Sequence, residues 1–177
     1  ALLSKANLLS LSLKVFGSKL IYREIFNHPS FIFYPNTLLR MIRFLAVAKL
    51  TSDWTIKWLN QNCLSGRSVF YTYWFDSSTL GIGLAKQRYP DIRLISRVHG
   101  YDLYEEHYYN PPYLPFRRTS LALLEAIFPD SQAGLQYLTR KFPEYSALYK
   151  TALLGVEDPG FITLPSTDGV FRVISCS

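Results

Sequence analysis

The residues best suited to chemistry lie in one short segment of the chain. His99 and Gly100 follow Ile92 to Val98, which we predict to be a strand. An imidazole can donate to a phosphate or a hydroxyl without carrying a fixed charge, and Gly100 permits a tight turn beside it. Asp102 could hydrogen-bond a sugar hydroxyl or orient the imidazole. The spacing alone is equally consistent with a His–Asp pair that only stabilises a loop.

An alternation of strands and helices is expected to position this segment. The predicted strands are 69–73, 92–98, 126–128 and 150–154, and the predicted helices between them are 78–88, 116–124 and 131–141. Such an order predicts right-handed βαβ units and a parallel sheet, hence an α/β fold with functional loops at the carboxyl ends of the strands. We therefore expect His99 on a tight turn at the end of a parallel strand, facing an open cleft. A ring packed inside the fold would contradict this placement.

The first third of the chain gives weaker signals. Helices are predicted from Thr37 to Leu50, capped by Asn36, and from Ser52 to Asn62, capped by Ser52 itself. Residues 1–30 fit a strand or a helix equally well. Gly81-Ile82-Gly83 falls within a predicted helix, so we interpret its glycines as packing residues.

Composition and charge narrow the class of protein. The 177 residues, of which 18% are charged, fit one folded domain, and no apolar run approaches the ~20 residues of a membrane span. The whole positive net charge of +6 lies in residues 1–50, which hold seven basic residues and one acid. That segment could face anionic lipid, a phosphorylated acceptor or nucleic acid, or it could be a solvated helical face. No nucleic-acid motif accompanies it. Cys63 and Cys176 show no metal or disulfide spacing, as expected in a reducing compartment.

The segment His99-Gly100-Tyr101-Asp102-Leu103-Tyr104 after a strand resembles the histidine loop of family 4 glycosyltransferases, which are retaining enzymes of GT-B fold. Three further features resemble that family in the expected order. They are Ile127-Phe128-Pro129-Asp130-Ser131 with Gly134 and Tyr137-Leu138, then Leu154-Gly155-Val156, and finally Phe171 to Ser177. The resemblance covers residues 69–177. A Gly-rich loop, which opens such domains in the family, is absent from the start of this chain.

The resemblance implies roles for residues in three loops. His99 would be catalytic, near the reacting centre, with Gly100, Tyr101 and Asp102 binding substrate or supporting that loop. Thr72, Tyr73 and Trp74 would line the acceptor cleft, and Ser131 would touch the substrate unless it only caps a helix. The tyrosines of the loop, Tyr101, Tyr104, Tyr108 and Tyr109, suit stacking on sugars or ordinary surface packing.

The resemblance also implies a domain plan and a reaction. Residues 1–155 would form a Rossmann-like, acceptor-side domain without its first strand, 156–169 a linker, and 170–177 the start of a nucleotide-sugar-binding domain. The reaction would move a sugar from a nucleotide-sugar to a glycan or lipid-linked acceptor in bacterial polysaccharide synthesis, with no metal or other cofactor. The enzyme would be cytoplasmic, or peripheral to the inner face of the membrane through residues 1–50, and would bind no nucleic acid. A non-catalytic sugar-binding or scaffolding domain of the same fold is the alternative.

Overall fold

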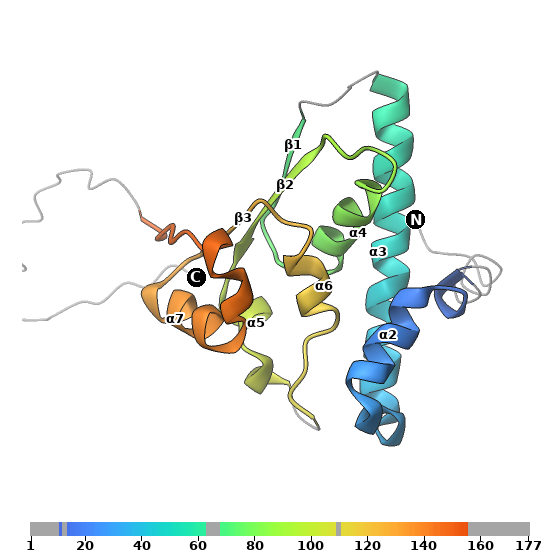
Figure 1. Cartoon of the computed structure of the whole chain (residues 1–177), viewed down its shortest axis with the longest axis horizontal. Helices are drawn as coiled ribbons and strands as arrows, with labels where there is room; N and C mark the ends of the chain where they lie inside the picture. Colours follow the sequence, from blue (N-terminus) through green and yellow to red (C-terminus); the bar gives the residue numbers. More distant parts are fainter. Residues whose placement is uncertain (1–10, 12–13, 63–67, 109–110, 156–177) are drawn as a thin grey trace, which may run out of the picture.

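The chain folds as an α/β unit around a three-stranded parallel sheet (Figure 1). A computed structural model describes residues 11, 14–62, 68–108 and 111–155. The strands are β1 (Val69–Thr72), β2 (Arg93–Val98) and β3 (Ala126–Pro129), and they lie in the order of the sequence. Both neighbouring pairs are parallel. The prediction of an α/β fold with a parallel sheet and flanking helices is confirmed.

No regular strand forms at the predicted 150–154, and an isolated parallel bridge lies just before this segment. Tyr149 pairs with Ile127, and the amides of Lys150 and Ala152 donate to carbonyl oxygens of β3 at 3.0 Å. The chain therefore runs beside β3 in the predicted position and direction, without regular strand pairing.

Helices follow each strand and leave one face of the sheet partly open. The α-helices on the connections are α4 (Ser77–Ala85), the one-turn helix α5 (Gly100–Leu103), α6 (Arg117–Leu121) and α7 (Gln132–Lys141). The 3-10 helices are η2 (Glu105–His107) and η3 (Pro143–Leu148). Right-handed crossovers that all step in one direction place their helices on the same face. Alternate strand residues match this arrangement, because Leu94 and Val98 are fully buried whereas Val69 and Tyr71 are more than half exposed.

One long helix, α3 (Pro35–Asn62), replaces the two helices predicted on either side of Thr51. Ser52 is not an N-cap but a buried residue in the middle of α3. Neither glycine nor proline interrupts the helix after its first residue, and the Thr55 hydroxyl donates to the carbonyl oxygen of Thr51 at 2.8 Å. The predicted break was wrong. Small polar residues often cap helices, but inside a helix their hydroxyl groups can also donate a hydrogen bond to a carbonyl oxygen of the preceding turn.

Close contact between α3 and α4 explains those small residues. A Cβ atom added to Gly81 would lie 2.5 Å from the carbonyl oxygen of Ala48 and from Cβ of Thr51, and one added to Gly83 would lie 2.7 Å from Leu123. The packing role predicted for Gly81 and Gly83 is confirmed. Figure 1 shows the sheet, α4 and α3 as successive layers.

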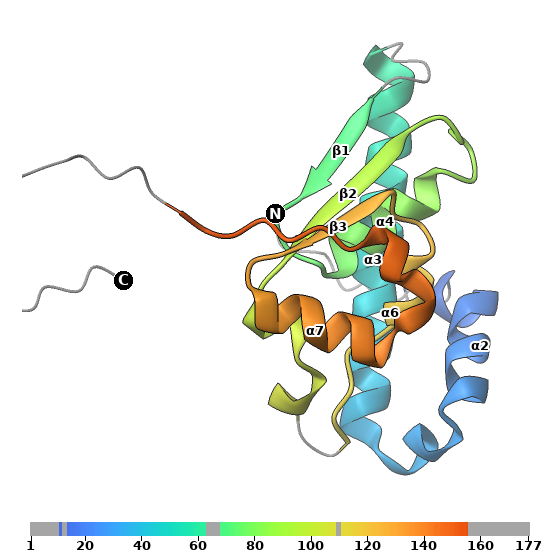
Figure 2. The same ribbon diagram turned by 60° about the vertical axis from the view of Figure 1, so that its left-hand side comes forward.

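A helical hairpin precedes the sheet. It consists of α2 (Lys19–Asn27), η1 (Pro29–Phe33) and the first half of α3, and it extends beside the rest of the molecule (Figure 2). Of the stretch that fitted either strand or helix, Lys19–Asn27 is therefore helical, while residues 1–10 and 12–13 lie outside the described part. An apolar core, with Ile21, Met41, Leu45 and Phe116 fully buried, joins the hairpin to α4 and to the start of α6.

Glu24 fastens the hairpin to the loop before α6. Its buried carboxylate accepts a hydrogen bond from the Tyr113 hydroxyl at 2.5 Å and one from the Phe116 amide at 2.9 Å. Phe116 has a left-handed φ of 55°, which is unfavourable by about 1–2 kcal/mol for a residue with a Cβ atom. The fully buried ring of Phe116 and its bond to Glu24 hold this conformation.

None of the helices that the structure describes is both long and apolar enough to cross a lipid bilayer. The linker predicted at 156–169 and the second-domain strand predicted at 170–177 lie outside the described residues. Both stay predictions.

Candidate functional site

The three strands end at one edge of the sheet, where most of the predicted site residues lie. Register places Thr72 opposite Ser96 and Val98 opposite Pro129. The segments that leave this edge are 73–76 after β1, 99–100 after β2 and 130–131 after β3. In parallel α/β sheets, ligands bind outside the carboxyl ends of the strands. The prediction that His99 follows a parallel strand at this edge is confirmed.

The imidazole of His99 is covered, which is a correction to the open placement that we expected. His99 precedes the first residue of α5 in extended conformation, but only 8% of it is exposed. Its ring lies 4.5 Å from the ring of Tyr73 and 4.6 Å from that of Trp74, centroid to centroid. These two side chains follow β1, fold over the end of β2 and are themselves about half exposed. The ring is thus packed one aromatic layer below the surface.

Both ring nitrogens of His99 are buried and lack a hydrogen-bond partner among the described residues. A buried polar atom without a partner is unfavourable by about 1–3 kcal/mol. Such atoms are uncommon in folded proteins, and a ligand or an ordered water is one usual explanation. A movement of Tyr73 or Trp74 would give a ligand access to the imidazole.

Asp102 joins the loops after β1 and β2. Its carboxylate accepts hydrogen bonds from the backbone amide of Phe75 at 2.5 Å and from that of His99 at 2.7 Å. Burial raises the pKa of Asp102, whereas these amide hydrogen bonds and the charge of Arg117 act in the opposite direction. Asp102 thereby holds the backbone on both sides of the site, and makes no hydrogen bond to the imidazole.

Arg117 completes this bridge and was not singled out from the sequence. Its guanidinium donates to the carbonyl oxygen of Phe75 at 2.9 Å and to that of Asp102, and it lies 4.5 Å from the centroid of the Phe75 ring. Burial lowers the pKa of Arg117 to about 10, although Asp102 opposes the shift. Arg117 directly follows the left-handed residue Phe116, and no local sequence pattern reveals a left-handed phenylalanine.

Thr72 and Ser131 have structural roles in this conformation, whereas no such role requires a glycine at position 100. The Thr72 hydroxyl is buried and lies 2.8 Å from the Thr79 hydroxyl and 2.9 Å from that of Ser96. Ser131 caps α7 by accepting from the Gly134 amide at 3.1 Å. Gly100 has an ordinary backbone conformation, and an added Cβ would be no closer than 3.8 Å to another residue. The turn therefore does not need a glycine there, in contrast to our expectation.

A pocket of about 500 Å³ opens beside His99. It brings together Trp74, Tyr101 and Asp102 of the predicted site, whereas Thr72, Tyr73, His99, Gly100 and Ser131 are not among its lining residues. Its other lining residues are Arg40, Phe44, Phe75, Asp76, Ser77, Tyr108, Leu114, Pro115 and Arg117. We call this the edge pocket.

Aromatic and charged groups face each other in the edge pocket. The Tyr101 and Tyr108 rings are 5.8 Å apart, and the Arg40 guanidinium lies 4.9 Å from the Tyr108 centroid. Burial, and the neighbouring Tyr101, raise the pKa of Tyr108 to about 12, so its hydroxyl stays protonated at neutral pH. Asp76 caps α4 by accepting from the Ser78 amide at 2.8 Å. The pocket thus offers aromatic faces together with donors and acceptors.

The remaining loop tyrosines differ in their placement. Tyr104 packs against Tyr137 at 4.8 Å and does not line the edge pocket, while Tyr109 lies outside the described residues. Arg40 and Asp76 were missed. Asp76 had a usable signal, since it stands between a predicted strand and a predicted helix, whereas Arg40 reaches the site from a helix distant in sequence.

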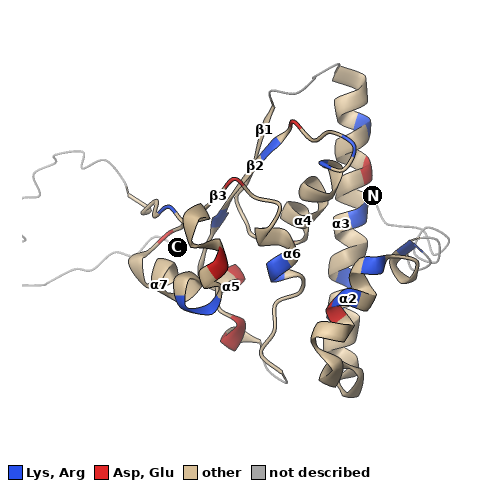
Figure 3. Cartoon of the chain, in the orientation of Figure 1, with Lys and Arg blue, Asp and Glu red and all other residues tan. Residues whose placement is uncertain are grey.

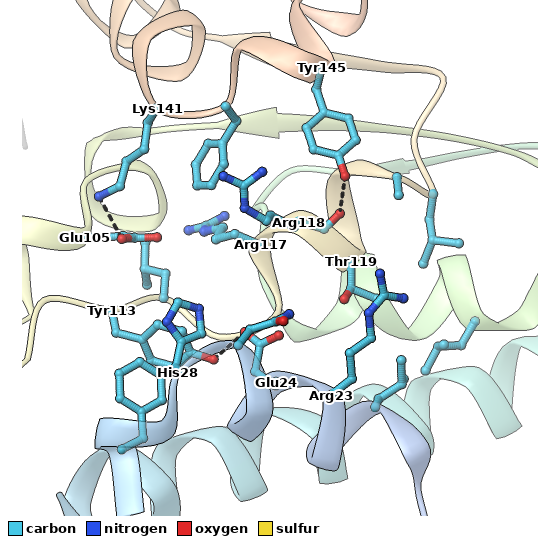
Figure 4. A pocket seen from close by; sticks show the side chains of 18 of the residues that line it. Arg23, Glu24, His28, Glu105, Tyr113, Arg117, Arg118, Thr119, Lys141 and Tyr145 are labelled. Carbon is cyan, nitrogen blue, oxygen red and sulfur yellow. Dashed lines mark hydrogen bonds and ion pairs between the residues drawn. The ribbon is translucent and has the colours of Figure 1, made fainter.

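A larger cavity of about 870 Å³ lies between α2, α6 and η3 (Figure 4). Most of its charged side chains are already engaged. Lys141 is 2.7 Å from Glu105, and Arg118 forms an ion pair with Glu144. None of the residues predicted for the site lines this cavity.

Within the described ranges, no group of three or more His, Cys, Asp or Glu side chains is arranged to hold a metal ion. Searches against protein-family models, curated proteins and solved structures found no significant match to this chain. The site must therefore be interpreted from its own geometry.

Proposed function

We propose that this chain is the Rossmann-like, acceptor-side domain of a retaining GT-B glycosyltransferase and that the edge pocket binds the acceptor glycan. The proposal joins the resemblance around His99 to the position of the pocket. A parallel sheet whose strands end at a ligand-sized pocket is the arrangement on which Rossmann-like domains bind their substrates. In this scheme a second domain holds a nucleotide-sugar as co-substrate, and the reaction uses no metal or other cofactor.

The lining of the edge pocket is the observation that carries the proposal. Trp74 and Tyr101, about half exposed or more, present aromatic faces at the carboxyl edge of the sheet. Sugar rings have apolar faces that stack on such side chains and hydroxyls that need donors and acceptors. Arg40 and Asp76 supply a donor and an acceptor in the same pocket. A glycan is a ligand that can use both kinds of group.

His99 has a conditional role in this scheme. Its ring is adjacent to Trp74 but covered, so contact with a sugar requires Tyr73 or Trp74 to turn aside. Binding energy from the acceptor could drive that movement, as loop and lid movements do in many enzymes. The unpartnered nitrogens of His99 would then gain a hydroxyl or a phosphate as partner.

The covered ring also favours a second candidate, a non-catalytic sugar-binding or scaffolding domain. Such a domain would use the Trp74 and Tyr101 faces without exposing His99. The reading frame beyond Ser177 separates the two, because neither candidate gives this chain transferase activity on its own. The division of labour in the first proposal requires that this chain alone turns over no nucleotide-sugar, and that the reading frame beyond Ser177 encodes a domain with a basic pair and spaced glutamates for the donor diphosphate. The transferase proposal fails if the frame encodes no such domain.

Fluorescence titration tests glycan binding at the edge pocket. Trp74 is the one tryptophan of the chain that lines it, because Trp54 and Trp58 lie on α3 outside the pocket. A panel of bacterial oligosaccharides should shift the emission of the wild-type chain and of Trp54→Phe. The shift should disappear in Trp74→Phe. Equal responses in both variants, or no saturable response to any glycan, would reject the site.

A further inference from the structure

The tip of the helical hairpin carries unusually exposed apolar side chains. Phe26 and Phe33 are 84% and 82% exposed, more than any other large apolar residue in the described part of the chain, and Ile32 is 61% exposed. Phe26 lies in the last turn of α2, and Ile32 and Phe33 end η1, where the chain reverses into α3. Figure 2 shows the end of α2 and the turn into α3, the segments that carry these three residues, at one end of the molecule.

Packing of Phe31 fixes this exposure. Phe31 is buried, with its ring stacked on that of His28 at 4.7 Å and tilted against that of Tyr113 at 4.3 Å. This ring anchors the turn to the body of the protein. Its neighbours Ile32 and Phe33 are therefore exposed although the turn itself is held in place by packing. The apolar tip is a fixed surface of the fold.

Basic residues stand behind the tip. On α2, the residues Lys19, Tyr22, Arg23 and Phe26 follow the spacing of one helical face, and all four are exposed. Arg43 is exposed on α3. No ion pair links Lys19, Arg23 or Arg43 to another described residue. Figure 3 shows the basic residues distributed along α2 and α3.

Only one acid on the hairpin, Glu24, offsets this positive charge. Glu24 is the only acid in the first fifty residues, and its buried carboxylate is occupied by Tyr113 and Phe116. The hairpin thus combines an apolar tip with positively charged helices, α2 and α3, next to it. Two copies of this surface would repel each other, so charge complementarity favours an anionic occupant over a second copy of the chain.

We infer that the tip of the hairpin docks the protein on an anionic lipid surface. Phe26, Ile32 and Phe33 enter the interface between headgroups and acyl chains, where aromatic side chains are favoured. Lys19, Arg23 and Arg43 lie near the headgroup phosphates. Stable attachment without a membrane span needs two signals, and apolar insertion with basic attraction supplies both. This docking does not depend on the proposed sugar transfer.

Vesicle co-sedimentation of the whole chain tests the inference. The probe is vesicles of phosphatidylcholine mixed with phosphatidylglycerol, compared with vesicles of phosphatidylcholine alone. We expect binding to the mixed vesicles that weakens with added salt. The variant Phe26→Ser/Phe33→Ser should bind roughly tenfold less tightly or worse, and Lys19→Glu and Arg23→Glu should each weaken binding by about fivefold or more.

Matched controls separate docking from general effects. Tyr71→Ser removes a half-exposed aromatic residue on β1, and Arg140→Glu reverses an exposed charge on α7, so both should bind like the wild type. Circular dichroism and gel filtration of each variant check folding and self-association. Equal binding to both kinds of vesicle, wild-type binding by the double serine variant, or a dimer that this variant abolishes would each overturn the proposal. Loss of docking would leave glycan-dependent fluorescence of Trp74 unchanged, so the two proposals fail separately.

Discussion

The carboxylate of Asp102 and the backbone amide of Phe75 are joined by a hydrogen bond of 2.5 Å. The same carboxylate binds the amide of His99, so one buried side chain connects the loop after β1 with the loop after β2. Trp74 lies in the loop after β1, and Tyr101 lies in α5, which directly follows the loop after β2; both residues line the edge pocket. The shape of the edge pocket therefore depends on a residue whose oxygens bond to the backbone.

Replacement of Asp102 by Asn should destabilise the fold. The variant keeps the size of the side chain but offers one oxygen where two amides need acceptors. At pH 7 we expect the free energy of unfolding to fall by about 1–3 kcal/mol, the penalty for leaving a buried amide unpaired. Urea denaturation measures the change. Asp91→Asn, at an exposed position, is the control and should change stability by no more than about 0.5 kcal/mol. Equal effects in the two variants would contradict the role of Asp102 in joining the loops after β1 and β2.

The pH dependence of stability should carry a contribution from Asp102. Burial raises the pKa of Asp102 above the usual 3.8. Between pH 3.8 and this raised pKa, the carboxyl of Asp102 therefore holds its proton more tightly in the folded chain than in the unfolded chain. Linkage then makes this contribution to the free energy of unfolding fall as the pH rises through the raised pKa. Asp102→Asn does not titrate at this position. Hence the stability of the wild type minus that of the variant should decrease from acid to neutral pH. An increase would mean that the amide bonds outweigh burial.

Local patterns in the sequence predicted the elements better than the site. The segments of the three strands, their parallel order and the packing role of Gly81 follow from short runs of residues. The burial of His99 does not, because Tyr73 and Trp74 cover it from the segment that follows another strand, β1. Arg40 was also not predicted, because it reaches the edge pocket from α3, which is distant in sequence from most of the other residues of the pocket.

Gly81→Ala should destabilise the contact between α3 and α4. Alanine favours a helix by up to about 1 kcal/mol over glycine, but its Cβ would lie 2.5 Å from a backbone oxygen of α3. Overpacking of this kind is unfavourable by about 1–3 kcal/mol, so the net change should be a lower melting temperature. Gly100→Ala is the matched control, since its Cβ meets nothing closer than 3.8 Å. If the Gly81 variant is as stable as the control, α3 and α4 can move apart without a loss of stability.

The hydrogen bond between Glu24 and Tyr113 should hold the hairpin to the body of the protein. A double-mutant cycle of Glu24→Ala and Tyr113→Phe should give a coupling energy of about 1–3 kcal/mol, because the bond is buried and charge-assisted. The exposed ion pair of Lys14 and Asp53, at 3.6 Å, is the control and should show coupling near zero. Urea denaturation of the four chains in each cycle supplies the values. Additive effects at Glu24 and Tyr113 would mean that other contacts hold the hairpin.

His99→Phe separates a packing role of the imidazole from a chemical one. Phenylalanine keeps an aromatic ring against Tyr73 and Trp74 and removes two buried nitrogens that have no partner among the described residues. The free energy of unfolding should therefore stay constant or rise by up to about 1 kcal/mol. If those nitrogens bind a sugar hydroxyl or a phosphate, glycan affinity in the Trp74 titration should fall by roughly tenfold, the value of one lost hydrogen bond in a closed site. A variant that is more stable and binds glycan as well as the wild type would make His99 a packing residue and remove it from the proposed reaction.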